Sequence, residues 1–188
     1  MIYAFIGCFR DTWLTNPMGN GKTMAMTYYG YMDHLEGRKT VANYFTSFSE
    51  QMTVENMVKL FNETDLQNIT LLVDEIHVIF DSLGHKQSKT RLIRNMITQT
   101  RKRKVDLYYT CQRWMSVNKT LREMTTFIML PYKVHTHDGK ECQIDHCPEE
   151  HEIVLTCQVP WRPNPLKIIN CKAVGSLYDS NQLITEKY

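Results

Sequence analysis

The sequence predicts an α/β fold in which helices flank a mostly parallel sheet, with antiparallel strands added near the C-terminal end. Two features support this prediction. A glycine-rich turn at residues 18–23 stands between an apolar strand candidate and a helix candidate, and a second apolar strand candidate, residues 69–73, ends in Asp74 and Glu75. Because ligands bind at the carboxyl ends of parallel strands, the turn and the two carboxylates should meet at one edge of the sheet.

The glycine-rich turn has the features of a phosphate-binding loop. Residues 16–23 have the sequence NPMGNGKT, and in such a turn consecutive backbone N–H groups converge on the phosphates of a nucleotide. The lysine neutralises phosphate charge, the threonine hydroxyl binds Mg²⁺, and the glycines permit positive φ values. The turn therefore predicts a P-loop NTPase that binds ATP and Mg²⁺. Its predicted binding residues are Gly19, Asn20, Gly21, Lys22 and Thr23.

The first glycine of the usual G-x-x-x-x-G-K-[ST] pattern can be matched to this sequence in two ways. In one, Asn16 takes its place, since asparagine also tolerates left-handed backbone geometry. In the other, residues 2–7 form the strand that leads into Gly7 as the first glycine, and residues 8–17 are an insertion. We prefer the second alignment, because residues 10–15 begin with two charges and make a poorer buried strand.

The two carboxylates have different predicted roles. Asp74 would hold Mg²⁺ and its hydration shell together with Thr23, and Glu75 would polarise the attacking water as a general base. An apolar strand that meets a polar turn is common by itself, but with the glycine-rich turn upstream it indicates nucleotide hydrolysis. Gln112 ends another predicted strand, residues 105–111, and can contact the γ-phosphate or orient the water.

Length and composition limit the alternatives. The 188 residues can bury one sizeable core, so we expect a single domain, 1–188, with a nucleotide-binding core at 1–130 and a β-hairpin with antiparallel extension at 131–188. Hydrophobic residues at 43% and charged residues at 22% are ordinary for a globular protein. The net charge of +2 is too small to indicate nucleic-acid binding from bulk composition.

The sequence also bears on location. No apolar run has the roughly 18 residues of a membrane helix, and the N-terminus lacks a signal-peptide pattern. We therefore expect no membrane contact and a cytoplasmic protein, in the host cell if it is viral, with the virion as a second location. The cysteines are scattered, which suits buried thiols or metal ligation in a reducing compartment. They are Cys8, Cys111, Cys142, Cys147, Cys157 and Cys171.

Hydrophobic spacing predicts the elements that follow the turn. Residues 22–37 should form a helix, because apolar side chains recur at three- and four-residue spacing and Gly37 stands where a helix ends. Residues 40–45 are β-branched and aromatic, which favours a strand. Thr53 can cap a helix that ends near residue 62.

A polar linker at residues 81–89 leads into a predicted helix, residues 90–104, whose last turn is basic. Arg101 and Arg103 lie in this turn. Cations there can simply complement the helix dipole. Alternatively, an arginine can stabilise charge on a transferring phosphate.

The C-terminal part has a different character. We expect a short helix at 116–124 and a strand at 126–130, followed by a hairpin turn signal at 138–139. Residues 159–165 hold three prolines, and residues 166–174 are a further strand candidate. These signals predict the antiparallel extension.

Histidines and cysteines gather around the predicted hairpin turn. Tetrahedral zinc takes mixed thiolate and imidazole ligands, and the turn could bring the two arms together. The predicted zinc ligands are His137, Cys142, Cys147 and His151. The competing interpretation is a set of exposed histidines with incidental thiols, since the spacing matches no strong zinc signature.

Several motifs together resemble the FtsK–HerA superfamily of DNA-pumping ATPases, and within it small archaeal viral packaging-type ATPases and Zot-like proteins. They are MGNGKT at 18–23, LLVDEIH at 71–77, TQTRKR at 98–103, YYTCQ at 108–112 and LYDSNQ at 177–182. The resemblance implies a P-loop NTPase fold of the RecA-like ASCE class. It also implies a five-stranded core in which the strand before the loop is central and the strand of Gln112 lies between it and the strand of Asp74.

The resemblance also implies partners. It implies a ring of about five or six subunits in which Arg101 or Arg103 completes the neighbouring site, double-stranded DNA as the substrate, and a capsid or portal-like viral protein as a partner. Zot-like proteins of filamentous phages usually continue into a membrane helix, which this sequence does not show. We therefore favour genome packaging over Zot-like assembly or extrusion.

Two other classes of protein could carry the same nucleotide-binding motifs. A nucleotide or small-molecule kinase could use the same loop, but it does not need the water-activating Glu75. A nucleotide-switched binding module with weak hydrolysis is the other rival. Turnover of ATP that is stimulated by DNA would separate the motor from both.

Overall fold

The computed structural model describes residues 1–8, 19–62, 67–77, 95, 100, 102–142, 144, 147–162 and 164–179. The strands are β1 (Ile2–Cys8), β2 (Lys39–Ala42), β3 (Glu50–Gln51), β4 (Ile69–Val73), β5 (Asp106–Arg113), β6 (Phe127–His135), β7 (His151–Val159) and β8 (Lys167–Asn170). The helices are α1 (Lys22–Leu35), α2 (Val54–Asn62), α5 (Lys119–Met124), α6 (Cys171–Gly175) and the 3₁₀ helix η1 (Trp114–Ser116).

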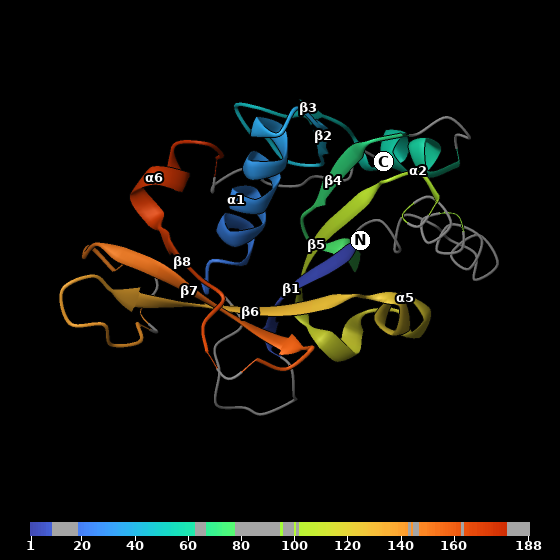
Figure 1. Cartoon of the computed structure of the whole chain (residues 1–188). Coiled ribbons are helices and arrows are strands. Elements are labelled where there is room, and N and C mark those ends of the chain that lie inside the picture. The colour runs from blue at the N-terminus through green and yellow to red at the C-terminus, as the bar shows by residue number, and fades with distance from the viewer. Residues whose placement is uncertain are drawn as a thin grey trace.

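These strands form one eight-stranded sheet in the order β3-β2-β4-β5-β1-β6-β7-β8 (Figure 1). The pairs from β3 to β6 are parallel, whereas β7 pairs antiparallel with both β6 and β8. The predicted mostly parallel α/β sheet with an antiparallel C-terminal extension is therefore confirmed. β1 lies inside the sheet, and β5, the strand of Gln112, lies between β1 and β4, as expected.

Alternating side chains bury both faces of the central strands. Ala4 and Ile6 of β1 belong to one apolar cluster, which includes Met57 of α2 and residues of η1 and α5. Phe5 points into a second cluster, which includes Met26 of α1 and residues of α6. Helices thus cover the sheet on two sides, and Figure 1 shows α1 and α6 together on one of them. Burial on both faces explains why β1 and β4 are nearly continuous apolar runs.

Some element boundaries differ from the predictions. The strand expected at 40–45 is β2, and the strand expected at 126–130 continues as β6 to His135. The helix expected at 116–124 is divided into η1 and α5, because the Asn118 side chain accepts a 2.9 Å hydrogen bond from the Thr120 N–H and starts a new helix.

The C-terminal strand candidate is also shorter than predicted. β8 ends at Asn170, whose side chain accepts a 3.2 Å hydrogen bond from the Ala173 N–H and begins α6. β7 is the second strand of the expected β-hairpin. The sequence interpretation gave no bounds for it, although Ile153, Leu155 and Cys157 alternate as buried residues along it.

Other predictions fall outside the described residues. The linker at 81–89 is one, and of the helix at 90–104 only a few positions are described. Within the described ranges, no helix has both the length and the apolar character needed to cross a membrane.

Candidate functional site

The phosphate-binding turn lies between the end of β1 and the start of α1. Gly19 and Gly21 have φ values of 70° and 81°, the left-handed geometry that favours glycine, and α1 begins at the next residue, Lys22. The Asn20 side chain donates a 3.5 Å hydrogen bond to the Gly7 carbonyl, which brings the chain back to the end of β1. Asn16 and residues 9–18 lie outside the described ranges.

The antiparallel extension supports this turn directly. A Cβ atom placed on Gly21 would lie 2.2 Å from Cδ1 of Ile153 on β7. Ile153 is buried, with 1% of its surface exposed. The φ value of Gly21 favours glycine, and any side chain at this position would force Ile153 to move.

Thr23 and Asp74 meet as the predicted Mg²⁺ site requires. The Thr23 hydroxyl donates a 2.9 Å hydrogen bond to Oδ1 of Asp74. A hydroxyl at the start of α1 and a carboxylate at the end of β4 are thus adjacent oxygen donors, the ligand type that Mg²⁺ prefers. The donor set fits Mg²⁺ held by Thr23 and by Asp74 or its bound water.

Two polar residues that the sequence interpretation missed hold the carboxylate strand end in place. Asn43, directly after β2, donates a 2.9 Å hydrogen bond to the Asp74 carbonyl and accepts one of 2.7 Å from the Asp74 N–H. Thr110 on β5 donates to Oδ1 of Asp74 at 2.6 Å and accepts from the Glu75 N–H at 2.8 Å. Asn43 directly follows β2 and Thr110 lies in the second half of β5, and these two strands flank β4. Polar residues near the carboxyl ends of neighbouring strands are the signal that could have found them.

The Glu75 carboxylate lies among polar side chains. The φ value of Glu75, 52°, is unusual for a residue with a side chain. The Gln112 amide donates a 3.4 Å hydrogen bond to Oε1 of Glu75, and Nδ1 of His77 lies 3.3 Å from Oε2. Glu75 and Gln112 are thus brought together beside Asp74 and the phosphate turn.

Lys22 is held close to both carboxylates. Only 8% of its surface is exposed, and this burial lowers the pKa of its ammonium group, while the negative charges of Glu75 and Asp74 oppose that shift. A partly desolvated ammonium interacts more strongly with an incoming phosphate than an exposed one.

Arg103 lies at the other end of the sheet. Its backbone carbonyl accepts a 3.1 Å hydrogen bond from the N–H of Asn68, directly before β4, whereas Asp74 directly follows β4. Nη1 of Arg103 is buried and has no hydrogen-bond partner among the described residues. The structure does not bring Arg103 to the phosphate turn of its own chain, and Arg101 lies outside the described residues.

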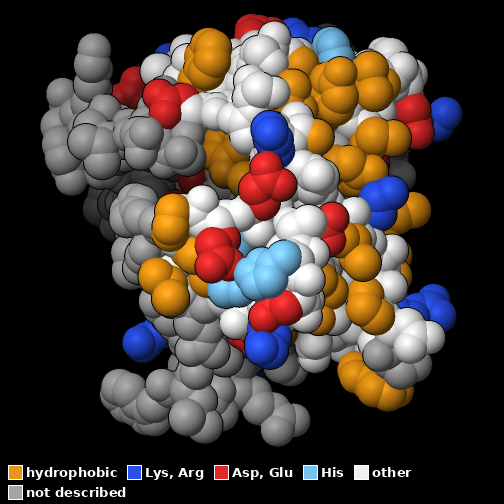
Figure 2. Space-filling model, turned by 90° about the vertical axis from the view of Figure 1, so that its left-hand side faces the viewer, with side chains coloured by type: hydrophobic (Ala, Val, Ile, Leu, Met, Phe, Trp, Pro, Cys, Tyr) orange, Lys and Arg blue, Asp and Glu red, His pale blue; other side chains and the backbone are white. Residues whose placement is uncertain are grey.

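A separate cluster of histidines and cysteines lies where β6 ends and β7 begins. Its ligand atoms belong to His135, Cys142, Cys147 and His151 and all lie within 4.8 Å of one another. Of the predicted zinc ligands, the structure brings Cys142, Cys147 and His151 together, and His135 joins them where His137 was expected. β6 continues to His135, which pairs directly opposite His151, whereas the His137 side chain is 63% exposed. Figure 2 shows histidine side chains at this surface among acidic ones.

Fold and site together define the class: the chain has a P-loop NTPase fold with a phosphate turn, a magnesium-type donor pair and a glutamate beside them. The sequence matches no protein-family model and no curated protein. Among solved structures, the N-terminal domain of zonular occludens toxin from Neisseria meningitidis shares this fold with a TM-score of 0.55 at 15% identity, covering 95% of this chain and 98% of that one.

Two further solved structures show weaker likeness. A KaiC-like protein from the hyperthermophilic archaeon Pyrococcus horikoshii has a TM-score of 0.48 at 11% identity, covering 90% of this chain and 82% of that one. The pCW3 conjugation coupling protein TcpA, solved with ATPγS, has a TM-score of 0.48 at 11% identity, covering 89% of this chain and 59% of that one.

Proposed function

We propose that the protein is an ATPase that uses hydrolysis at this site to translocate double-stranded DNA, and that the DNA is a viral genome being packaged into a capsid. The observation that carries the hydrolytic part is the arrangement around Glu75. Its carboxylate lies one residue after Asp74 and within hydrogen-bond reach of Gln112, at 3.4 Å. A carboxylate so placed can take a proton from a water molecule while a neighbouring amide orients that water.

The rest of the turn accounts for substrate binding. Lys22 and the N-terminus of α1 supply positive charge for the phosphates of ATP. Thr23 and Asp74 would hold Mg²⁺, which neutralises charge between the phosphate oxygens. Asn43 and Thr110 fix the backbone of Asp74 and Glu75, so the reacting groups are oriented before the substrate arrives.

The motor part of the proposal is supported by the motif resemblance and by the fold. We propose a ring of about five or six subunits, in which an arginine of one subunit reaches the nucleotide of its neighbour. The position of Arg103 at the opposite end of the sheet suits a role in a neighbouring site rather than its own. Arg101 is the second candidate. A capsid or portal-like protein would anchor the ring.

A second candidate function is that of a Zot-like ATPase in the assembly or extrusion of a filamentous virus. The observation that favours it is the shared fold with the zonular occludens toxin domain, which extends over 98% of that domain. Both candidates use the same hydrolytic site. They differ in the nucleic acid and in the partner that the motor serves.

ATP turnover with and without nucleic acid tests the proposal. We expect phosphate release that is stimulated by linear double-stranded DNA and absent from the Lys22→Ala variant. Stimulation by single-stranded DNA alone would favour the extrusion ATPase. Transfer of phosphate to a small acceptor, with no release to water, would show a kinase instead. Slow turnover that no DNA accelerates would indicate a nucleotide switch.

A further inference from the structure

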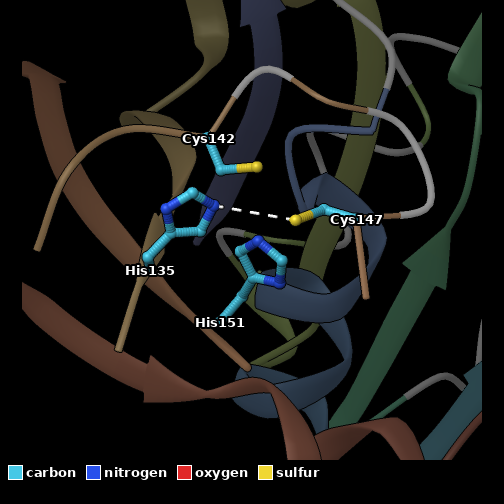
Figure 3. A group of neighbouring side chains, drawn as sticks. All are labelled: His135, Cys142, Cys147 and His151. Atoms are coloured by element: carbon cyan, nitrogen blue, oxygen red, sulfur yellow. Dashed lines mark hydrogen bonds between the residues drawn. The ribbon is translucent and has the colours of Figure 1, made fainter. Parts of the chain in front are cut away.

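The backbone brings four metal-type donors to one place at the end of the β6–β7 hairpin (Figure 3). His135 is the last residue of β6, and His151, the first residue of β7, lies directly opposite it. The Cys142 N–H donates a 2.9 Å hydrogen bond to the Lys133 carbonyl, so the connecting segment folds back along β6. Cys147 approaches the histidines from the other arm of this segment.

The spacing of the donor atoms suits one metal ion. Zinc–sulfur bonds of about 2.3 Å and zinc–nitrogen bonds of about 2.0–2.1 Å place tetrahedral ligands about 3.3–3.8 Å from one another. Nε2 of His135 lies 3.7 Å from Sγ of Cys147, and all four donors lie within 4.8 Å of one another. Small side-chain movements would therefore complete a tetrahedron.

The hydrogen bonding of the histidines also supports a metal site. Nε2 of His151 is buried and has no hydrogen-bond partner in the described part of the chain. Nδ1 of His135 lies 3.6 Å from a carboxylate oxygen of Glu149 and 3.8 Å from one of Asp138, while its Nε2 faces Cys147. One ring nitrogen directed at a carboxylate and the other at the donor cluster is the usual arrangement of a zinc-bound histidine.

The segment between β6 and β7 needs such a ligand to hold its shape. Among its described residues, 136–142, 144 and 147–150, only Cys142 is buried. Apolar burial therefore contributes little to ordering it. A metal bound by its two cysteines and by both flanking strands would fix the segment at four points.

We propose that His135, Cys142, Cys147 and His151 bind one Zn²⁺ ion in a closed, structural site. Two thiolates balance the charge of the ion, and four protein ligands leave no open position for a substrate. This site is independent of the proposed function, because it requires neither nucleotide nor DNA.

The test uses the full chain and measures metal directly. Purified protein should contain about one zinc per chain by elemental analysis. After the zinc is removed, titration with Co²⁺ should produce the visible bands of tetrahedral cobalt and thiolate-to-cobalt charge-transfer absorption. Because wild-type protein is used, this measurement does not depend on a variant that folds. A wild-type chain that binds neither metal, or that carries a Cys142–Cys147 disulfide after purification under reducing conditions, would overturn the proposal.

Variants separate the four proposed ligands from their neighbour. Cys147→Ser and His151→Ala should each weaken zinc binding at least tenfold, whereas His137→Ala should leave the metal content unchanged. His137 is the matched control because it lies two residues from His135 and its ring stacks on it with centroids 5.5 Å apart. Loss of zinc in His137→Ala with retention in His151→Ala would contradict the assignment.

Discussion

The Thr110 hydroxyl accepts a 2.8 Å hydrogen bond from the backbone N–H of Glu75. Glu75 has a φ value of 52°, and holding a non-glycine residue there costs about 1–3 kcal/mol that its surroundings must offset. The same hydroxyl donates to Asp74 at 2.6 Å. One side chain on β5 thus holds the carboxylate of Asp74 and the backbone of Glu75, the two residues that follow β4.

Replacing Thr110 by Val should therefore lower ATP turnover about tenfold or more, because the shape is nearly kept while both hydrogen bonds are lost. Thr110→Ser keeps the hydroxyl and should retain most of the activity. Steady-state kinetics of both variants, with circular dichroism to confirm folding, checks this. Equal activity of the two variants would show that the hydroxyl does not position Glu75.

Replacing Glu75 by Gln should leave ATP binding nearly intact and cut turnover by a factor on the order of 10² or more, as expected when a positioned base is lost. Binding of a fluorescent ATP analogue and phosphate release measure the two effects separately. Normal hydrolysis by this variant would remove Glu75 from the proposed role.

Gly21→Ala should weaken nucleotide binding more than backbone strain alone explains, because the added Cβ meets Ile153 at 2.2 Å. Gly37→Ala is the matched control: Gly37 also has a φ of 81°, but nothing lies within 4 Å of its Cβ position. Both variants should lose about 1–2 kcal/mol of stability from the left-handed backbone, and only Gly21→Ala should also lose ATP affinity. Thermal melts and ATP titrations compare them. Equal ATP affinity in the two variants would mean that the contact with β7 does not shape the turn.

Lys22→Met should make the nucleotide-free protein more stable while abolishing ATP binding. Burial leaves the Lys22 pKa below its ordinary value of 10.5 in the folded protein, so the unfolded chain binds this proton more tightly. The free-energy cost of burying the charged ammonium is fully present below the pKa of Lys22 in the folded protein. This cost disappears as the pH rises toward the pKa of Lys22 in the unfolded chain. Removing the charge removes the cost at neutral pH, and the melting temperature should rise by roughly 2–4 °C per kcal/mol. A lower melting temperature at pH 7 would contradict this account.

The contact between Thr23 and Asp74 was predictable because each side chain has a fixed place in the motif: one starts the helix after the turn and the other ends a parallel strand. Thr110 and Asn43 depend instead on strand register. Val73 pairs with Tyr109, and this places Thr110 beside Asp74. Short apolar patterns do not specify such register, because neighbouring alignments bury similar side chains.

The choice between His135 and His137 shows the same limit of sequence patterns. Both residues follow the apolar part of β6 and are separated by two positions, so alternation alone treats them alike. The residue at which the β6–β7 pairing ends determines which histidine joins the cluster, and this residue is His135. That end is set by the turn at 136–139, where the Gly139 N–H bonds to the His135 carbonyl at 2.9 Å, and not by hydrophobicity.

The continuity of β6 has a mechanical consequence. This strand pairs with β1 through residues 127–129 and continues to His135, so it joins the strand that leads to the phosphate turn to the tip of the hairpin. Its pairing with β7 shifts register once, between Ile128 and Met129, and then runs in register from Met129 to His135. If the hairpin tip bears a load, β6 would pass small displacements along this paired stretch toward β1 and the nucleotide.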